Sequence, residues 1–146
     1  MALDDFLHFV HPKYKEGVIT NSVSKLLLAQ KEFGEILPAS FAIYENVLLT
    51  TRYNAVTDID LLVVDVTAMQ ASFYMLKSYL DRHNCRSSKR NESQLKRAYT
   101  FVKAKYNFEP ELYAVKYDPL ENFFRIKRYR IENPKDFDLV FIPCVS

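Results

Sequence analysis

Two aspartates, Asp58 and Asp60, stand one residue apart at the start of the apolar run in VTDIDLLVVDV, residues 56–66. On a strand, residues two positions apart project from the same face, so their carboxylates would lie side by side. Such a pair can hold one or two Mg²⁺ ions for phosphoryl chemistry. The same pair can also be the solvated start of a buried strand, with Asp65 helping to cap the next helix. We favour this second interpretation.

The segment TDIDLLVV is similar to the metal-binding strand of the nucleotidyltransferase superfamily. The resemblance implies that Asp58 and Asp60 bind Mg²⁺ and that Asp138, in FDLVFI near the end of the chain, supplies a third carboxylate. These enzymes carry a Gly-Ser turn shortly before the aspartates, where this chain has Thr50 and Thr51. A side chain there obstructs the close approach of the backbone to a triphosphate.

Positive charge is concentrated in the second half of the chain. Residues 1–80 carry six Lys or Arg against nine Asp or Glu, a net charge of −3, whereas residues 81–146 carry fourteen against nine, a net charge of +5. Within residues 82–105, eight basic side chains accompany a single acidic one, Glu92. Charge separated in this way predicts that the second half meets a polyanion or an acidic protein surface.

A predicted helix over residues 92–106 carries part of this charge, and its apolar residues share one face: Leu95, Ala98, Tyr99, Val102 and Tyr106. The preceding segment CRSSKRN is expected to be a connector, which places Lys89 and Arg90 just ahead of the helix. Cations there oppose the helix dipole, and a bound phosphate would relieve that conflict. The candidate nucleic-acid-binding residues of this region are Lys89, Arg90, Lys96, Arg97 and Lys103.

The strand FFRIKRYRI, residues 123–131, mixes aromatic and basic side chains. Period-two alternation divides it into one face with Phe123, Arg125, Lys127, Tyr129 and Ile131 and another with Phe124, Ile126, Arg128 and Arg130. A face that mixes aromatic rings with cations can stack bases and follow a phosphate backbone, and its candidates are Arg125, Lys127 and Tyr129. Alternatively, the long basic side chains cover apolar neighbours. As a middle strand, it must also satisfy its cations through a partner or through acidic residues such as Glu111 and Asp118.

A sheet flanked by helices would position these residues. We expect helices over residues 3–9, 21–38 and 67–84, the second capped by Asn21 and the third by Thr67. Met69, Phe73, Leu76 and Leu80 form the buried stripe of the third. Strands are expected over 41–51 (or two short strands around Glu45 and Asn46) and over 58–66, which is apolar on both faces and therefore central.

After Pro110, the runs LYAVKYD, FFRIKRYRI and FDLVFIP predict an antiparallel meander. The fold class is therefore α+β, with α/β as an alternative. We expect one layered domain over residues 1–146, with a central mixed sheet flanked by helices.

Composition excludes several classes of site. With Gly17 and Gly34 as the two glycines of the chain, Walker-type and dinucleotide-binding loops are absent. Cys85 and Cys144 are too far apart to form a metal-spaced pair. An acidic start and the lack of a long apolar segment predict a soluble, intracellular protein without a membrane partner, whether cytoplasmic, nuclear or virion-associated.

Three functional hypotheses follow. The first is a non-enzymatic accessory or assembly subunit that contacts RNA or DNA through its basic helix and its basic, aromatic strand, with no cofactor. The second is a structural component of a virion or other large complex, in which the basic patch meets an acidic protein and the chain is a homo-oligomer or one subunit. The third is a divergent nucleotidyltransferase-like domain that uses Mg²⁺ on Asp58, Asp60 and Asp138.

Overall fold

The computed structural model describes residues 2–78, 84–118, 120, 123–133 and 138–142. In this part of the chain, six strands form one mixed sheet in the order β1-β2-β3-β4-β5-β6. Neighbouring strands are antiparallel except β3 and β4, which are parallel and are connected through the long helix α4. The helices are α1 (Ala2–Val10), α2 (Ser22–Leu28), α3 (Lys31–Ile36) and α4 (Asn84–Tyr106), and the strands are β1 (Phe41–Thr50), β2 (Ala55–Asp65), β3 (Gln70–Ser78), β4 (Glu111–Asp118), β5 (Phe123–Asn133) and β6 (Asp138–Ile142). The predicted α+β fold and the C-terminal meander are confirmed.

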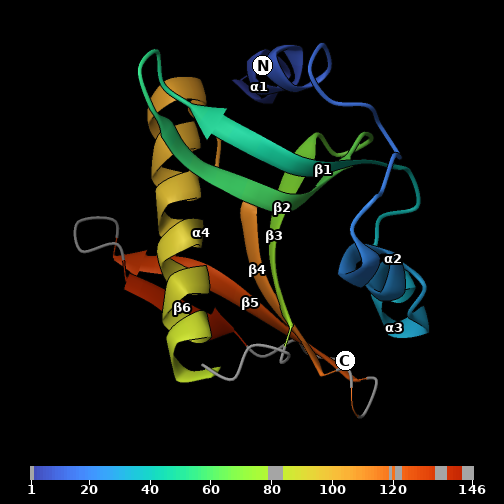
Figure 1. Cartoon of the computed structure of the whole chain (residues 1–146). Helices are drawn as coiled ribbons and strands as arrows, with labels where there is room; N and C mark the ends of the chain where they lie inside the picture. The colour runs from blue at the N-terminus through green and yellow to red at the C-terminus, as the bar shows by residue number, and fades with distance from the viewer. Residues whose placement is uncertain (1, 79–83, 119, 121–122, 134–137, 143–146) are drawn as a thin grey trace.

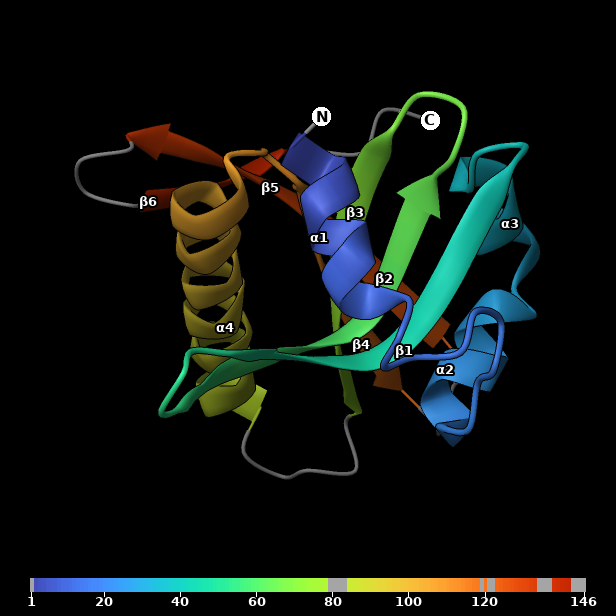
Figure 2. The ribbon, with the colours of Figure 1, turned by 90° about the horizontal axis from the view of Figure 1, so that it is seen from above.

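Helices α1 and α4 cover one face of the sheet (Figure 2). Leu95, Ala98 and Val102 form the buried stripe of α4, as the sequence predicts. In α1, the ring of Phe6 is fully buried and its centroid lies 6.1 Å from that of Phe73 in β3. Complete burial of a side chain of this size contributes about 2–3 kcal/mol. On this side of the sheet, α1 and α4 therefore pack against the same strand, β3.

Helices α2 and α3 cover the opposite face, so the molecule has three layers (Figure 1). Leu27 of α2 and Phe33 of α3 are buried there. The predicted cap is confirmed, because the side chain of Asn21 accepts hydrogen bonds from the first backbone N–H groups of α2. The predicted single helix over residues 21–38 is instead two short helices, because the backbone at Gln30 is extended.

Strands β1 and β2 form a long hairpin whose outer half leaves the sheet. β2 pairs with β1 along nearly its whole length but with β3 only over Leu61–Asp65. Asn46 has a positive φ of 52°. Before Asn46, even-numbered residues of β1 such as Tyr44 point into the core on the α4 side. After it, odd-numbered residues such as Val47 do so. The outer half of the hairpin thus turns away from β3 and reaches α4 (Figure 2).

The predicted helix over residues 67–84 is wrong, because Gln70–Ser78 form β3, which pairs with β2 on one side and β4 on the other. Phe73 and Tyr74, adjacent in sequence, lie in the two opposite cores. A strand buried on both faces gives a continuous apolar run, which periodicity cannot distinguish from a helix. The predicted central position of β2 is confirmed for residues 61–64, which are buried on both faces.

Asp65 stabilises the β2–β3 turn and not the start of a helix. Its Oδ1 atom accepts hydrogen bonds from the backbone N–H groups of Thr67 and Ala68, at 3.1 and 3.0 Å. Met69 completes this turn with a positive φ of 53°.

Helix α4 begins at Asn84, so the segment CRSSKRN is helical and not a connector. Its Arg, Lys and Ser residues are compatible with a helix, and neither Gly nor Pro interrupts residues 84–106. Lys89 and Arg90 therefore lie within the helix and do not precede its start. The helix-dipole argument for a phosphate at these two residues therefore does not apply, and their role in binding nucleic acid stays a prediction.

Candidate functional site

An open groove of about 740 Å³ lies between the outer half of the β1–β2 hairpin and α4. Its exposed lining is mostly apolar, although three of the residues that contribute it are cationic: Thr51, Val56, Lys96, Arg97, Thr100, Phe101, Ala104 and Lys105. Such a surface can bind an anion that also carries apolar groups.

The geometry of α4 brings the cations of the groove together. Residues four apart are neighbours on a helix, so Arg97, Phe101 and Lys105 form one row along its surface, and Lys96 begins the adjacent row. The buried stripe of α4 lies on another side of the helix and packs on the sheet. Core packing therefore fixes the direction in which these rows face.

The positive charge of the groove is not balanced within the described structure. Glu92, one helical turn before Lys96, contacts the hydroxyl of Tyr129, and no acidic residue occurs between positions 93 and 106 of the sequence. Among the described residues, Lys96, Arg97 and Lys105 make no ion pair. The ammonium group of Lys105 lies 5.4 Å from the ring centroid of Phe101, a cation–π contact that leaves its charge in place.

Lys103 lies outside the groove lining, although it is on the same helix. Its ammonium group is 3.6 Å from the Glu109 carboxylate. The hydroxyl of Tyr99 also donates to Glu109, at 3.0 Å, and burial together with this carboxylate raises the pKa of Tyr99 to about 12. Of the predicted helix cations, Lys96 and Arg97 are thus brought together, whereas Lys103 faces an acidic neighbour.

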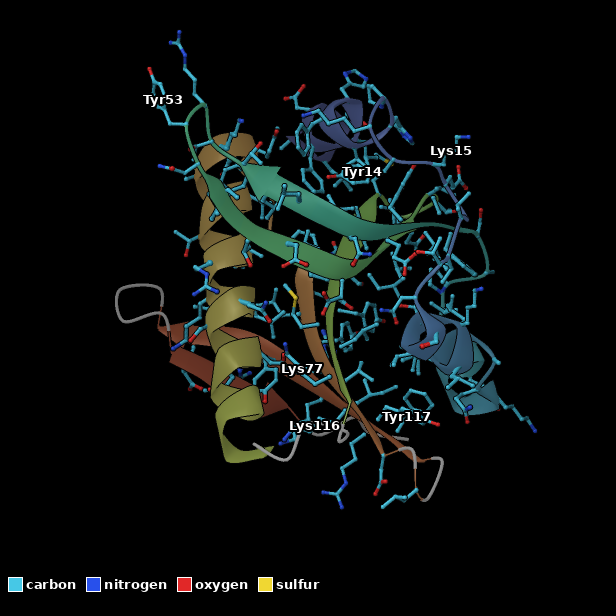
Figure 3. All side chains as sticks on the ribbon, viewed as in Figure 1. Tyr14, Lys15, Tyr53, Lys77, Lys116 and Tyr117 are labelled. Carbon is cyan, nitrogen blue, oxygen red and sulfur yellow. The ribbon has the colours of Figure 1, made fainter. Side chains whose placement is uncertain are left out.

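The tip of the hairpin presents two exposed side chains, Arg52 and Tyr53, which follow Thr51 of the groove in sequence. Thr51 and Asn54 close the turn, with 2.8 Å between the Thr51 nitrogen and the Asn54 carbonyl oxygen. Tyr53 is 82% exposed and projects away from the sheet (Figure 3). The guanidinium of Arg52 lies 5.6 Å from the centre of its ring. Sequence reasoning missed both residues, because nothing local indicates that this turn lies against α4.

The strand candidates of β5 lie on the face that α4 covers. Tyr129 is only 7% exposed and belongs to the core, so the structure does not offer it as a platform for a base. Its hydroxyl contacts the Glu92 carboxylate, and burial, with Glu92 acting in the same direction, raises the pKa of Tyr129 to about 12. Arg125 is exposed and Lys127 is partly buried, and neither lines the groove.

Arg125 joins a row of cations that the sequence did not reveal. It pairs in register with Lys116 of β4. Lys116 in turn pairs with Lys77 of β3, and both lysines are labelled in Figure 3. The parallel pairing of β3 and β4 creates this row, and the incorrect helix prediction for β3 concealed it.

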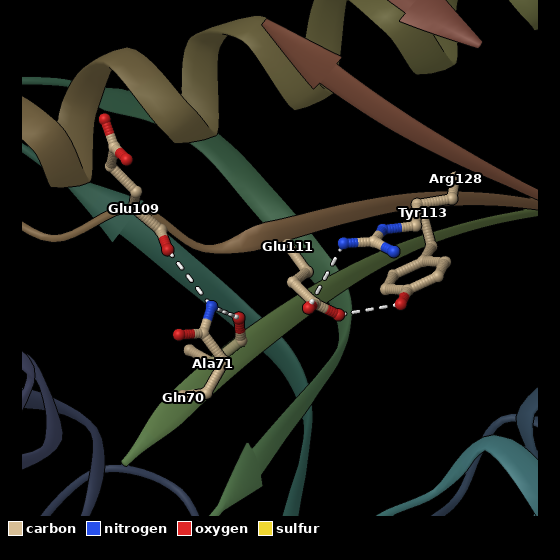
Figure 4. A network of polar contacts seen from close by, with 6 residues as sticks. All are labelled: Gln70, Ala71, Glu109, Glu111, Tyr113 and Arg128. Carbon is tan, nitrogen blue, oxygen red and sulfur yellow. Dashed lines mark hydrogen bonds and ion pairs between the residues drawn. The ribbon is translucent and has the colours of Figure 1, made fainter. Parts of the chain in front are cut away.

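The opposite face of β5 satisfies one of its cations internally, as the sequence suggests. Arg128 lies 3.4 Å from the carboxylate of Glu111, which also accepts a 2.7 Å hydrogen bond from the hydroxyl of Tyr113 (Figure 4). Close by, the side-chain amide of Gln70 donates to the backbone carbonyl of Glu109 (Figure 4). These contacts join β3, β4 and β5 and account for Glu111 as a structural residue.

The two aspartates of the opening segment do not meet the third. Asp60 is partly buried, and its carboxylate accepts a 2.7 Å hydrogen bond from the backbone N–H of Leu76. Asp138 begins β6, at the far edge of the sheet, with β3, β4 and β5 between it and β2. At about 4.8 Å per strand, that separation is roughly 19 Å. Within the described residues, no three His, Cys, Asp or Glu side chains are grouped to hold a metal ion.

Burial is the main cause of an unusual pKa at Asp60, which is raised to about 6. The adjacent Asp58 carboxylate acts in the same direction, whereas the Leu76 N–H and the charge of Lys77 oppose it. Asp60 therefore has a structural role, because its partly buried carboxylate holds the backbone of β3 through the Leu76 N–H.

No helix in the described part of the chain is both long and apolar enough to cross a membrane. Comparison with protein-family models, with curated proteins and with solved structures finds no match to this chain.

Proposed function

We propose that this chain is a non-enzymatic accessory subunit that contacts nucleic acid through the groove between α4 and the β1–β2 hairpin. The observation that carries this proposal is the set of three cations, Lys96, Arg97 and Lys105, that line one groove without an acidic partner among the described residues. Three like charges along one groove create a positive potential there, which an anionic ligand would neutralise.

A polyanion fits the groove better than a small anion does. The cations are spread along about 13 Å of helix between Lys96 and Lys105, given a rise of 1.5 Å per residue. Successive phosphates along a nucleic-acid strand can neutralise charges spaced in this way, and each contact releases counterions. RNA and DNA share this chemistry, and the proposal covers both.

Fluorescence anisotropy of labelled oligonucleotides across a salt series tests the proposal. We expect the logarithm of the affinity to fall linearly with the logarithm of the salt concentration, with a slope that indicates several phosphate contacts. Arg97→Glu is expected to weaken binding by more than tenfold at low salt. Lys25→Glu is the charge-matched control, because Lys25 is exposed on α2, on the opposite face of the sheet, and its reversal should change affinity only slightly.

The outcomes separate nucleic acid from an acidic protein partner. Polyglutamate serves as the competitor that carries negative charge without bases or phosphates. If polyglutamate binds as tightly as the oligonucleotides, or if no oligonucleotide binds at low salt, the proposal is wrong. An equal loss of affinity in Arg97→Glu and Lys25→Glu would also contradict it, because the groove would then have no special role.

A further inference from the structure

We infer that the groove selects single-stranded over duplex nucleic acid and that Tyr53 stacks on a base at its hairpin end. This inference rests on the proposed function and adds to it the class of nucleic acid. It follows from the apolar part of the groove and from the hairpin tip, neither of which a purely electrostatic contact requires.

The groove places apolar surface between its cations. Val56 comes from the hairpin, and Phe101 and Ala104 come from α4. The outside of a duplex presents phosphates and sugars, with its base faces stacked inside, so apolar surface gains little against it. A single strand exposes both its phosphates and the faces of its bases. A groove that combines Arg97 and Lys105 with apolar walls is therefore complementary to a single strand.

Tyr53 lies outside the groove lining, two residues after Thr51 at the hairpin tip. Its side chain is 82% exposed at the hairpin tip, so it adds little to the core (Figure 3). The turn that carries it is held by the contacts between Thr51 and Asn54, and Thr51 itself lines the groove. A strand that leaves the groove past Thr51 would reach the aromatic ring of Tyr53, with the guanidinium of Arg52 beside it. Aromatic rings and cations arranged in this way bind single strands with little sequence preference.

The dimensions are consistent with a short segment of strand. The distance of about 13 Å along α4 corresponds to roughly four nucleotides stacked at 3.4 Å each. A strand that also stacks one base on Tyr53 would occupy about five nucleotides, which lies within the range of small single-strand-binding surfaces.

The lack of tryptophan in the chain permits a direct test. Tyr53→Trp places one indole at the hairpin tip, and its fluorescence should be quenched when oligothymidylate binds and restored at high salt. A duplex of the same length should quench it much less. Leu120→Trp is the matched control, because Leu120 is 95% exposed in the β4–β5 connection, outside the groove, and its indole should not respond.

Affinity measurements on variants of Tyr53 that carry no indole complete the test. Tyr53→Ala should lower the affinity for a single strand about tenfold and leave that for a duplex unchanged, whereas Tyr53→Phe keeps the ring and should bind normally. If both nucleic acids bind with the salt dependence and Arg97→Glu sensitivity described above, but neither quenching nor a strand preference is seen, the inference fails and the proposed function stands. If neither nucleic acid binds, both fail.

Discussion

The side-chain carboxylate of Asp60 takes the place of a backbone acceptor for Leu76, with 2.7 Å between its Oδ2 atom and the Leu76 nitrogen. The register of β2 and β3 runs from the Asp65–Gln70 pair to the Leu61–Tyr74 pair, and Leu76 lies just beyond it. A buried backbone N–H without a partner is costly. The Asp60 carboxylate therefore supplies the hydrogen-bond acceptor that a backbone N–H of β3 needs where the hairpin turns away toward α4.

This relationship predicts a pH-dependent stability. The pKa of Asp60 is about 6 in the folded chain, against an ordinary value of 3.8, so the folded state holds the proton more tightly than the unfolded state. The contribution of Asp60 to stability is therefore greatest below about pH 4 and is lost as the pH rises through 6. Asp60→Asn, which can still accept from Leu76, should raise the free energy of unfolding at pH 7 by on the order of 2 kcal/mol.

Urea unfolding between pH 4 and pH 8 measures this effect. The difference between Asp60→Asn and the original chain should grow as the pH rises and reach a plateau above pH 7. Glu35→Gln removes an exposed carboxylate from α3 and serves as the control. A difference that stays constant with pH would show that the effect does not arise from titration of Asp60.

A second prediction concerns Glu45, a buried carboxylate of β1. It accepts hydrogen bonds from the backbone nitrogens of Thr20 and Asn21, at 2.6 and 2.7 Å, and thereby attaches the start of α2 to the sheet. Glu45→Ala leaves both N–H groups without this partner and should lower the free energy of unfolding by about 2–4 kcal/mol. Glu45→Gln, which retains one acceptor, should cost less. Hydrogen exchange of α2 would locate the loss, and unchanged protection there would contradict the assignment.

Asn91 gives a third prediction, because it extends the buried stripe of α4 with a polar side chain. It is 1% exposed, and neither polar atom of its side chain has a hydrogen-bond partner among the described residues. Asn91→Leu removes that cost and should raise the free energy of unfolding by about 1–3 kcal/mol. Ser93→Leu, at an exposed position of the same helix, should change it by less than about 0.5 kcal/mol. A destabilised Asn91→Leu variant would mean that the amide has a role that leucine cannot replace.

Elements whose local sequence agrees with their environment could be predicted. The stripe of Leu95, Ala98 and Val102 repeats at helical spacing, and Asn21 has the side chain that caps a helix. The alternation in β5 also correctly separates Tyr129 from Arg128. These features depend on neighbours within a few residues, which the sequence displays directly.

Features created by contacts between distant segments could not be predicted. β3 resembles a helix in its spacing, and its pairing with β4 depends on a crossover through α4. The burial of Tyr129 depends on that same helix lying over β5. The groove depends on the turn of the hairpin near Asn46, so Lys96 and Arg97 were found as charges on a helix, but Thr51 and Tyr53 were not.

The last prediction compares two lysines on α4 that differ by two positions. Lys105 lines the groove without an ion pair in the described structure, whereas Lys103 lies 3.6 Å from Glu109 and outside the groove. Lys105→Gln should reduce the salt slope for a single strand by about 0.7, the value of one phosphate contact. Lys103→Gln makes the same change in net charge and should leave the slope nearly unchanged. Both variants should fold normally, because an exposed ion pair such as that of Lys103 contributes about 1 kcal/mol or less. Equal reductions in slope would show that the nucleic acid covers both sides of α4, and the groove would then not define the binding path.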